Sequence, residues 1–270
     1  MGLLGGKELR AVQDVSFYLQ RGEVVSLIGE SGSGKSTIGR MILRLLAVNA
    51  GTILVDDVDV SSLMGAPLRD YYRRVQGVFQ DPFSSCNPIF KVNHLFALLR
   101  DVYFRDLSEG EWRDKVAASL ATVNLEPGQV LHKFPHQLSG GQVQRLLIAR
   151  ALILDTEYLV ADEIISMLDA STRIDVLNLL GDLSARGLGI LFITHDLSLG
   201  NYISQRTVIL RRGRVVEMGA TTKVFGDPRH PYTRMLLASD PTLHDRWGTG
   251  TEAAAASPPF FGGLGRNQYS

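Results

Sequence analysis

Nine consecutive residues, Gly29-Glu30-Ser31-Gly32-Ser33-Gly34-Lys35-Ser36-Thr37, match the phosphate-binding P-loop pattern at every defined position. An apolar segment, 23–28, comes before them, and a segment with helical apolar spacing, 35–47, follows. This order predicts a buried strand, a tight glycine turn and a helix whose N-terminus faces an anion. A chance Lys-Ser in a glycine-rich turn is the ordinary alternative, and the correct flanking segments argue against it.

The residue types in and after this loop predict an ATP and Mg²⁺ site. Lys35 can reach the β- and γ-phosphates, and the Ser36 hydroxyl can ligate Mg²⁺. An apolar run, 159–161, then ends in Asp162 and Glu163. We expect Asp162 to hold Mg²⁺ and Glu163 to polarise the attacking water. Many strands end in solvated acids, so this pair gains weight only because a P-loop precedes it.

Strand-like and helix-like segments alternate along the chain, which predicts an α/β P-loop NTPase fold with a mostly parallel sheet. Strands are expected at 12–19, 23–28, 51–55, 75–79, 158–161, 189–193 and 207–210, and helices at about 35–47, 171–186 and 197–204. Residues 84–152 are predicted to be mostly helical and to form an inserted subdomain. The expected division is an ATP-binding core of residues 1–83 and 153–244, the helical insertion, and a flexible tail, 245–270.

Composition narrows the class of protein. Of the 270 residues, 45% are apolar, which is enough for a large core. Basic and acidic residues balance at 28 each, so the charge gives no case for nucleic-acid or anionic-membrane binding. A single cysteine, Cys86, excludes an internal disulfide and suits a reducing compartment. We expect no signal peptide and no transmembrane helix.

A second motif, Leu138-Ser139-Gly140-Gly141-Gln142, followed by Gln144-Arg145 and by 148–152, resembles the signature of the ABC ATPase family. Ser139 stands where a helix would begin, and the two glycines allow close backbone approach, as in an anion site. A simple helix N-cap is the alternative. The resemblance implies that Ser139, Gly140, Gly141 and Gln142 contact the γ-phosphate bound by an opposite subunit, so that two ATP molecules lie between two subunits.

Three further residues match the family's order along the chain. The resemblance implies that Gln80 senses Mg²⁺ and the γ-phosphate, that Asp169 lies in a loop crossing the dimer interface, and that His195 contacts the γ-phosphate. The catalytic set is then Glu163, His195 and Gln80, and the metal set is Ser36, Gln80 and Asp162. Taken alone, Gln80 would be a surface residue and His195 a strand-end histidine. The resemblance extends over about residues 10–240.

Segments 78–88, 135–137 and 230–237, with Asp240-Pro241, resemble the di- and oligopeptide importer ATPases, a group that also serves nickel, sugars and other solutes. This implies a peripheral subunit on the cytoplasmic face of a prokaryotic membrane. The implied partners are a second ATPase subunit, identical or related, two permeases and an extracytoplasmic solute-binding protein, with no nucleic acid. A soluble ABC ATPase acting on DNA or ribosomes is the alternative; its usual coiled coils, tandem cassettes and Cys pairs are missing. The signature argues against a P-loop kinase or GTPase.

The sequence departs from the family pattern in three places. Only eleven residues precede Val12, and none is the aromatic that stacks on adenine in the family; Phe17 and Tyr18 come too late. We therefore expect that the true start lies upstream. Ile164-Ile165 replaces the usual Pro-Thr, and these positions are expected to shape the turn without bearing the chemistry. The C-terminal tail lacks the cysteine cluster of some relatives, so no iron–sulfur site is expected.

Overall fold

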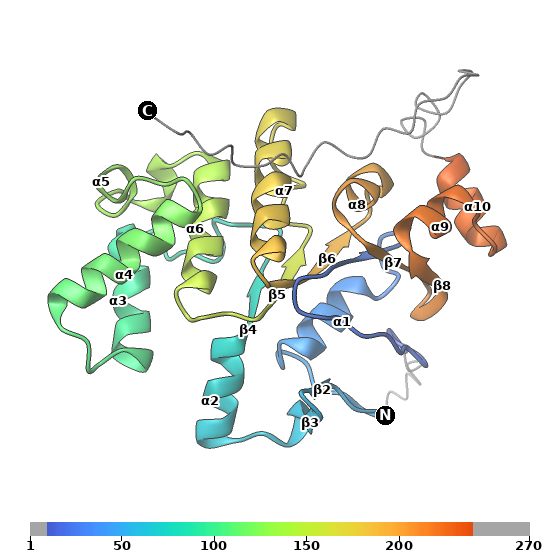
Figure 1. Cartoon of the computed structure of the whole chain (residues 1–270), viewed down its shortest axis with the longest axis horizontal. Helices are drawn as coiled ribbons and strands as arrows, with labels where there is room; N and C mark the ends of the chain where they lie inside the picture. Colours follow the sequence, from blue (N-terminus) through green and yellow to red (C-terminus); the bar gives the residue numbers. More distant parts are fainter. Residues whose placement is uncertain (1–9, 240–270) are drawn as a thin grey trace, which may run out of the picture.

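A six-stranded sheet in the order β4-β5-β6-β1-β7-β8 forms the centre of the molecule in the computed structural model, which describes residues 10–239 (Figure 1). All pairs are parallel except β7 with β8. The strands are β4 (Val75–Val78), β5 (Tyr158–Asp162), β6 (Gly189–Thr194), β1 (Val24–Ile28), β7 (Arg206–Arg211) and β8 (Arg214–Ala220). The predicted fold class, an α/β fold with a mostly parallel sheet, is confirmed.

Most buried apolar side chains of the sheet belong to one of two clusters, one on each face. One face, including Val24, Leu159 and Phe192, packs against α6 (Gly140–Leu152) and α7 (Ala170–Ala185). The opposite face packs against α1 (Lys35–Ile42) and α2 (Gly65–Arg74). Figure 1 shows α7 and α8 (Leu197–Ile203) above the sheet and α1 below it. Since every β1 residue is buried, the strand that leads into the phosphate loop is held from both sides.

The helices of the region 84–152 lie together at one end of the sheet, drawn in green in Figure 1. They are α3 (Val92–Tyr103), α4 (Glu109–Thr122), α5 (Pro127–Val130) and α6, with a 3-10 turn at Pro135–Gln137; residues 84–91 are not helical. Their buried residues, such as Phe96 and Trp112, belong to the same cluster as one face of the sheet. The helical region therefore shares its core with the sheet.

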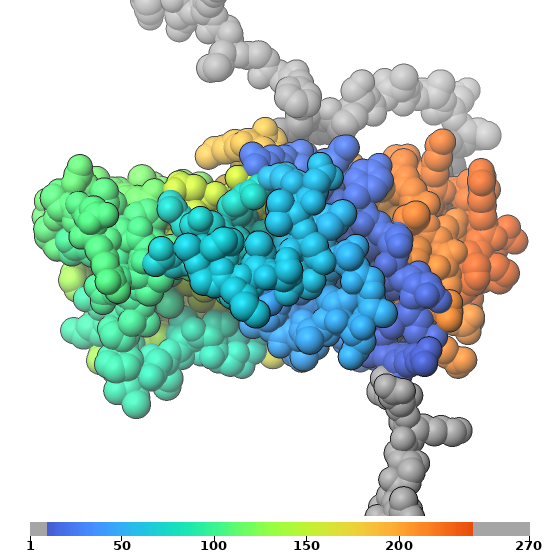
Figure 2. All heavy atoms as spheres, turned by 90° about the horizontal axis from the view of Figure 1, so that it is seen from below, coloured from blue at the N-terminus to red at the C-terminus, as the bar shows by residue number. Residues whose placement is uncertain are grey.

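The N-terminal third of the described chain covers the surface that faces downward in Figure 1. Figure 2 shows this surface in blue and cyan, between the green helical region and the orange C-terminal elements. It carries the hairpin of β2 (Leu54–Val55) and β3 (Val58–Asp59), joined by Asp56 and Asp57, which both have positive φ. The predicted strand 51–55 is thus reduced to its last two residues; Gly51, at its predicted start, has a positive φ of 92°.

Two further predicted elements differ from the structure. The strand expected over 12–19 does not form: in this segment the one hydrogen bond that reaches another part of the backbone runs from Gln13 N to Gly213 O. Its apolar side chains still pack against the second cluster, which is why the sequence alternates there. The helix expected over 35–47 ends at Ile42, since Arg44 adopts a left-handed conformation (φ 53°).

The C-terminal part of the described chain adds elements that the sequence did not predict. Strand β8 returns from β7 through a two-residue turn, Arg212-Gly213, with positive φ at both residues. Two short helices, α9 (Thr221–Gly226) and α10 (Pro231–Ala238), follow. Within residues 10–239, none of the helices combines the length and apolarity that a membrane crossing requires. The expectations for residues 1–9 and for the tail 245–270 lie outside the described residues.

Candidate functional site

The glycine-rich loop joins β1 to α1, as expected, and its backbone lies close to two other segments. A Cβ on Gly29 would come within 2.2 Å of the Leu210 carbonyl oxygen, so only glycine fits there. Gly34 combines a left-handed φ of 106° with a Cβ position 2.5 Å from the Ala11 carbonyl oxygen. The loop is therefore held between β7 and the N-terminal segment, and its glycines are required by both packing and conformation.

Lys35 is the first residue of α1 and turns back onto the loop. Its ammonium donates hydrogen bonds to the carbonyl oxygens of Gly29 (2.7 Å) and Glu30 (2.9 Å), and the residue is only 4% exposed. Burial lowers the Lys35 pKa, while the charges of Glu163, Asp162 and Glu30 act in the opposite direction. A buried cation that is held only by neutral carbonyls can form a stronger, charge-assisted bond with an anion.

Ser36 in the first turn of α1 and Asp162 at the end of β5 are joined by a hydrogen bond. The Ser36 hydroxyl donates to Asp162 Oδ1 at 3.0 Å, and Asp162 is 6% exposed at the end of β5. Burial raises the Asp162 pKa, the charge of Glu163 raises it further, and the bond from Ser36 lowers it. Thr37, the last residue of the loop motif, is half-buried in the first turn of α1. The structure thus brings together, beside Lys35, two oxygen atoms of the kind that ligate hard metal ions.

Glu163 and His195 form a direct pair at the same edge. His195 Nδ1 lies 3.2 Å from Glu163 Oε1, and the histidine is the more exposed partner. Parallel pairing of β5 with β6 sets Asp162 opposite Ile193. The Glu163 N–H then donates to the Ile193 carbonyl (2.9 Å) in a left-handed conformation, φ 52°. Such a conformation is uncommon for a glutamate and is held here by the neighbouring strand.

Gln80 follows β4 by two residues and is exposed. Since Val78 of β4 pairs with Ala161 of β5, the register carries Gln80 toward the edge where Asp162 and Glu163 lie. Within residues 10–239, its side chain makes no hydrogen bond. The structure therefore brings the Gln80 segment to the site without fixing its amide.

The signature loop, 138–142, is a helix N-cap in this chain. Ser139 Oγ accepts from Gln142 N (3.2 Å), and Gln142 Oε1 accepts from Ser139 N (3.0 Å), which makes a complete capping box for α6. A Cβ on Gly141 would lie 2.3 Å from Thr172 Cγ2, whereas Gly140 has only an ordinary contact with Leu168. Within residues 10–239, no hydrogen bond or ion pair joins this loop to residues 29–37.

The turn between β5 and α7 carries Asp169 and the unusual isoleucine pair. Asp169 caps α7: its oxygens accept from Ser171 Oγ (2.6 Å), Thr172 N (3.0 Å) and Thr172 Oγ1 (2.7 Å). The bond from Ser171 is the largest of the causes that hold the Asp169 pKa well below its usual value. Ile164 and Ile165 are 1% and 2% exposed in the first apolar cluster. Apolar side chains suit these positions because they point into the core.

The two aromatic residues Phe17 and Tyr18 lie before β1, and that they come too late to meet adenine stays a prediction. Phe17 packs into the second apolar cluster. The Tyr18 ring lies 3.7 Å from the guanidinium of Arg206, a residue that pairs with Val25 near the start of β1. The phosphate loop begins at the other end of that strand.

Tyr232 in α10 is a site contact that sequence reasoning missed. Its hydroxyl accepts a long hydrogen bond, 3.4 Å, from the backbone N–H of Glu30, a residue 202 positions earlier. The sequence marked 230–237 only as a family resemblance, and no local pattern shows that this tyrosine reaches the phosphate loop.

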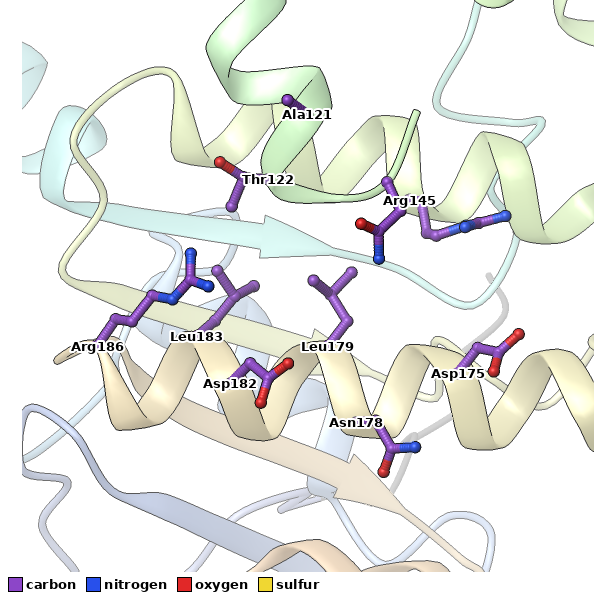
Figure 3. A pocket seen from close by; sticks show the side chains of 10 residues that line it. Ala121, Thr122, Arg145, Asp175, Asn178, Leu179, Asp182, Leu183 and Arg186 are labelled. Atoms are coloured by element: carbon purple, nitrogen blue, oxygen red, sulfur yellow. The ribbon is translucent and has the colours of Figure 1, made fainter. Parts of the chain in front are cut away.

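A surface hollow of about 460 Å³ lies elsewhere, between α4, α6 and α7 (Figure 3). Charged side chains face it from both walls, among them Arg145, Asp175, Asp182 and Arg186 (Figure 3). None of the residues that line it belongs to the predicted site, so the hollow is separate from the phosphate loop.

Comparisons with known proteins agree with this geometry. The sequence profile of the ABC transporter family matches residues 12–166, and that of the oligopeptide/dipeptide transporter C-terminal region matches 216–261. A peptide import ATP-binding protein of Brucella ovis is 42% identical over 236 residues, 87% of this chain and 74% of the relative. The glutathione import ATP-binding protein GsiA of Salmonella paratyphi A is 41% identical over 244 residues, 88% of this chain and 39% of the relative.

Two solved structures have a similar fold. The ATP-binding cassette MJ0796, a dimer bound to ADP and Pi, is 29% identical with a TM-score of 0.71, over 82% of this chain and 94% of that one. The cbiO1 protein of Clostridium perfringens is 25% identical with a TM-score of 0.72, over 88% and 92%. The chain belongs to the ABC transporter family and carries its ATP-binding cassette. The predicted resemblance to this family and to its di- and oligopeptide importer group is confirmed.

Proposed function

We propose that this chain is the ATP-binding and ATP-hydrolysing subunit of an importer for di- or oligopeptides or a related small solute. The observation that carries the proposal is the meeting of Lys35, the Ser36–Asp162 pair and the Glu163–His195 pair at one edge of the sheet. The match of 216–261 to the oligopeptide/dipeptide transporter C-terminal region favours peptide import over a soluble, non-transport ABC ATPase.

In this proposal the loop 29–37 binds the phosphates of ATP. Backbone N–H groups and the N-terminus of α1 face the phosphates, and Lys35 exchanges its carbonyl partners for β- and γ-phosphate oxygens. The exchange is favourable because the Lys35 ammonium is attracted more strongly by a phosphate anion than by a neutral carbonyl dipole. Lys35 already lies at the loop, so little rearrangement is needed.

The Ser36 hydroxyl and the Asp162 carboxylate fit Mg²⁺, because they are hard oxygen donors 3.0 Å apart. Residues 10–239 contain no cluster of three or more His, Cys, Asp or Glu side chains suited to a metal. Gln80 is the third proposed protein ligand. When bound, Mg²⁺ neutralises charge on the phosphates.

Glu163 is proposed to polarise the attacking water, and His195 to hold Glu163 and contact the γ-phosphate. The 3.2 Å contact between Nδ1 and Oε1 fixes the direction of the carboxylate, and the left-handed backbone at Glu163 is the strain expected of such a site. General-base assistance of this kind contributes about 10²–10⁴-fold to a rate. Glu163 is therefore the residue whose loss should be most damaging to turnover.

The residues Ser139, Gly140, Gly141, Gln142 and Asp169 are proposed to complete the site of a second ATPase subunit. Within residues 10–239, no hydrogen bond or ion pair joins them to the phosphate loop of their own chain; their caps are local, which favours a dimer with two shared ATP molecules. The dimeric state of MJ0796 in its ADP and Pi complex supports this arrangement. The second subunit is either identical or related.

Two permeases are the further proposed partners, with a solute-binding protein acting indirectly and no nucleic acid involved. We place the chain at the cytoplasmic face of the membrane, with residues 1–83 and 153–244 as the core and 84–152 as the moving helical subdomain. The segment that begins at Gln80 exposes Phe83 and Ile89 (42% and 76%), which suits contact with a permease. ATP binding would close the dimer through differential contacts, and hydrolysis would reopen it.

The test compares the purified chain with Glu163→Gln. The unaltered chain should hydrolyse ATP, and the variant should lose about 100-fold or more of the turnover while forming an ATP-dependent dimer in light scattering. Glu126→Gln, a change at an exposed glutamate, is the control and should behave as the unaltered chain. If the unaltered chain neither binds nor hydrolyses ATP, alone or with its partner ATPase, the proposal is wrong.

A further inference from the structure

The C-terminal segment 229–233 docks onto the phosphate loop through Tyr232. The tyrosine is 2% exposed, its hydroxyl meets the Glu30 N–H at 3.4 Å, and the guanidinium of Arg211 lies 4.6 Å from its ring centroid. Burial raises the Tyr232 pKa, so the phenol stays protonated at neutral pH and keeps a donor as well as an acceptor. Glu30 is the second residue of the loop, so this contact is made to the loop itself.

Glu217 of β8 fixes the position of that segment. One carboxylate oxygen accepts from Arg229 N (2.8 Å) and the other from His230 N (3.0 Å). His230 Nδ1 in turn accepts from Tyr232 N (3.1 Å) and caps α10. Both oxygens of one carboxylate are therefore used to place the backbone that carries Tyr232.

Strand β7 packs against both Tyr232 and the phosphate loop. Its Ile209 and the last residue of β1, Ile28, share an apolar cluster with Tyr232. The Leu210 carbonyl, also in β7, is the group that leaves no room for a Cβ at Gly29. Since β8 pairs with β7, the loop, the strand pair and α10 form one packed unit.

The peptide groups of Glu30 are held by different partners. The Glu30 N–H donates to the Tyr232 hydroxyl, whereas the Glu30 carbonyl oxygen accepts from the Lys35 ammonium at 2.9 Å. When Lys35 turns to the phosphates of ATP, as the proposed function requires, the carbonyl keeps only its hydrogen bond from the Ser33 N–H (3.2 Å). Tyr232 is then the side chain that still holds this residue of the loop in place.

We propose that Tyr232 is a positioning residue for the phosphate loop, and that segment 229–233 sets the affinity of the cassette for ATP. The inference rests on the proposed function, because ATP is the ligand. It assigns the C-terminal segment a task in nucleotide binding besides any contact with partner chains. A loop that is held in its binding shape loses less conformational entropy on binding, which strengthens binding.

The experiment measures the dissociation constant of the full chain for ATP with Mg²⁺ by calorimetry, for Tyr232→Phe beside the unaltered chain. Loss of the hydroxyl should raise the Kd about 2–10-fold, as expected for one hydrogen bond. The midpoint of thermal unfolding without nucleotide should change little because the ring stays. Turnover at saturating ATP should stay within about twofold, since Glu163 and His195 are untouched.

Two further variants sharpen the test. Tyr202→Phe removes a phenol that bonds to Asn178 Oδ1 (2.8 Å) far from the loop in sequence and should leave the Kd unchanged. Glu217→Gln leaves one acceptor oxygen for two N–H groups and should also weaken ATP binding. An unchanged Kd in this variant would overturn the role of segment 229–233.

A Kd of Tyr232→Phe within twofold of the unaltered chain, or a tighter one, would overturn the role of Tyr232. So would reduced turnover at saturating ATP with an unchanged Kd, because that result points to the Glu163–His195 pair instead. If the unaltered chain does not bind ATP, the proposed function fails and this inference fails with it. If only the variant result is negative, the proposed function stands.

Discussion

The phosphate loop, 29–37, and the signature loop, 138–142, both place glycines at the start of a helix, but they use their polar groups differently. The N-cap of α1, Gly34, supplies no side-chain cap, and the buried Ser33 hydroxyl beside it has no hydrogen-bond partner within residues 10–239. Helix α6 begins with the reciprocal Ser139–Gln142 capping box. An uncapped helix N-terminus leaves N–H groups for an anion, whereas a capped one is already satisfied within its own chain.

This difference suggests which part of the proposed ATP site one chain supplies by itself and which part a second subunit would complete. The phosphate loop has Lys35, Ser36 and the β5 acids beside it, so its binding groups are assembled in the monomer. In the proposed dimer, the signature loop would meet the γ-phosphate of the second subunit through groups that here form the Ser139–Gln142 capping box. Binding of ATP should therefore depend mainly on the first region, and local stability on the second.

The largest expected effect comes from breaking the first region. Lys35→Met should weaken ATP binding by about 100-fold, because the charge-assisted bonds to the phosphates are lost. Calorimetry with ATP and Mg²⁺ gives the Kd. Lys223→Met, at an exposed lysine of α9, should leave it unchanged. A loss of less than tenfold would show that the monomer does not rely on this loop.

A smaller effect should follow from crowding the second region. Gly141→Ala places a methyl group against Thr172 Cγ2 and should cost about 1–3 kcal/mol in the free energy of unfolding, measured in urea. Gly181→Ala, in α7 with open space around it, should instead stabilise by about 0.5–1 kcal/mol. Adding Thr172→Ser to Gly141→Ala removes the crowding methyl and should restore stability. No recovery in the double variant would mean that the close approach of α6 and α7 is not the cause.

The smallest effect concerns Asp169, which caps α7 beside the signature helix. Asp169→Ala should lower the thermal midpoint at pH 7 by about 2–4 °C. The folded-state pKa is depressed, so the carboxylate stabilises the fold above its ordinary pKa of 3.8 and loses this effect as the pH falls below it. The difference between the variant and the unaltered chain should thus be constant from pH 7 to 5 and narrow below pH 3.8. Asp175→Ala, at an exposed aspartate of α7 that caps nothing, is the control; an equal loss there would argue against the cap.

Local patterns predicted the parts of the site that depend on neighbouring residues. The loop from Gly29 to Thr37, the acids at the end of β5 and the helix start at Ser139 were all readable, because each has a defined spacing or flank. The family resemblance added Gln80, Asp169 and His195 as candidates. The structure brings Gln80 and His195 toward the β5 acids and sets Asp169 as a helix cap. The catalytic roles of Gln80 and His195 and the ATP-binding role of Asp169 are proposals.

Predictions of secondary structure failed where the local sequence pattern was compatible with more than one backbone conformation. Alternation over 12–19 indicated a strand, but the segment packs its side chains without entering the sheet. The helix that follows Lys35 was drawn too long, because nothing in the local pattern announced a left-handed Arg44. Strand β8 was missed because the two-residue turn before it places an arginine, Arg212, at a position of positive φ. The usual sequence signal for such a turn has Asn, Asp or Gly at this position.

The sequence by itself determined the class of the protein, the phosphate loop and the order of its motifs, since these depend on residue types at short spacing. Only the tertiary structure decided which distant groups touch. Parallel register brought Glu163 and His195 to 3.2 Å, and packing of α10 carried Tyr232 to the backbone of Glu30. Such contacts arise from strand order and helix packing, which join residues far apart in the chain and leave no trace in local spacing.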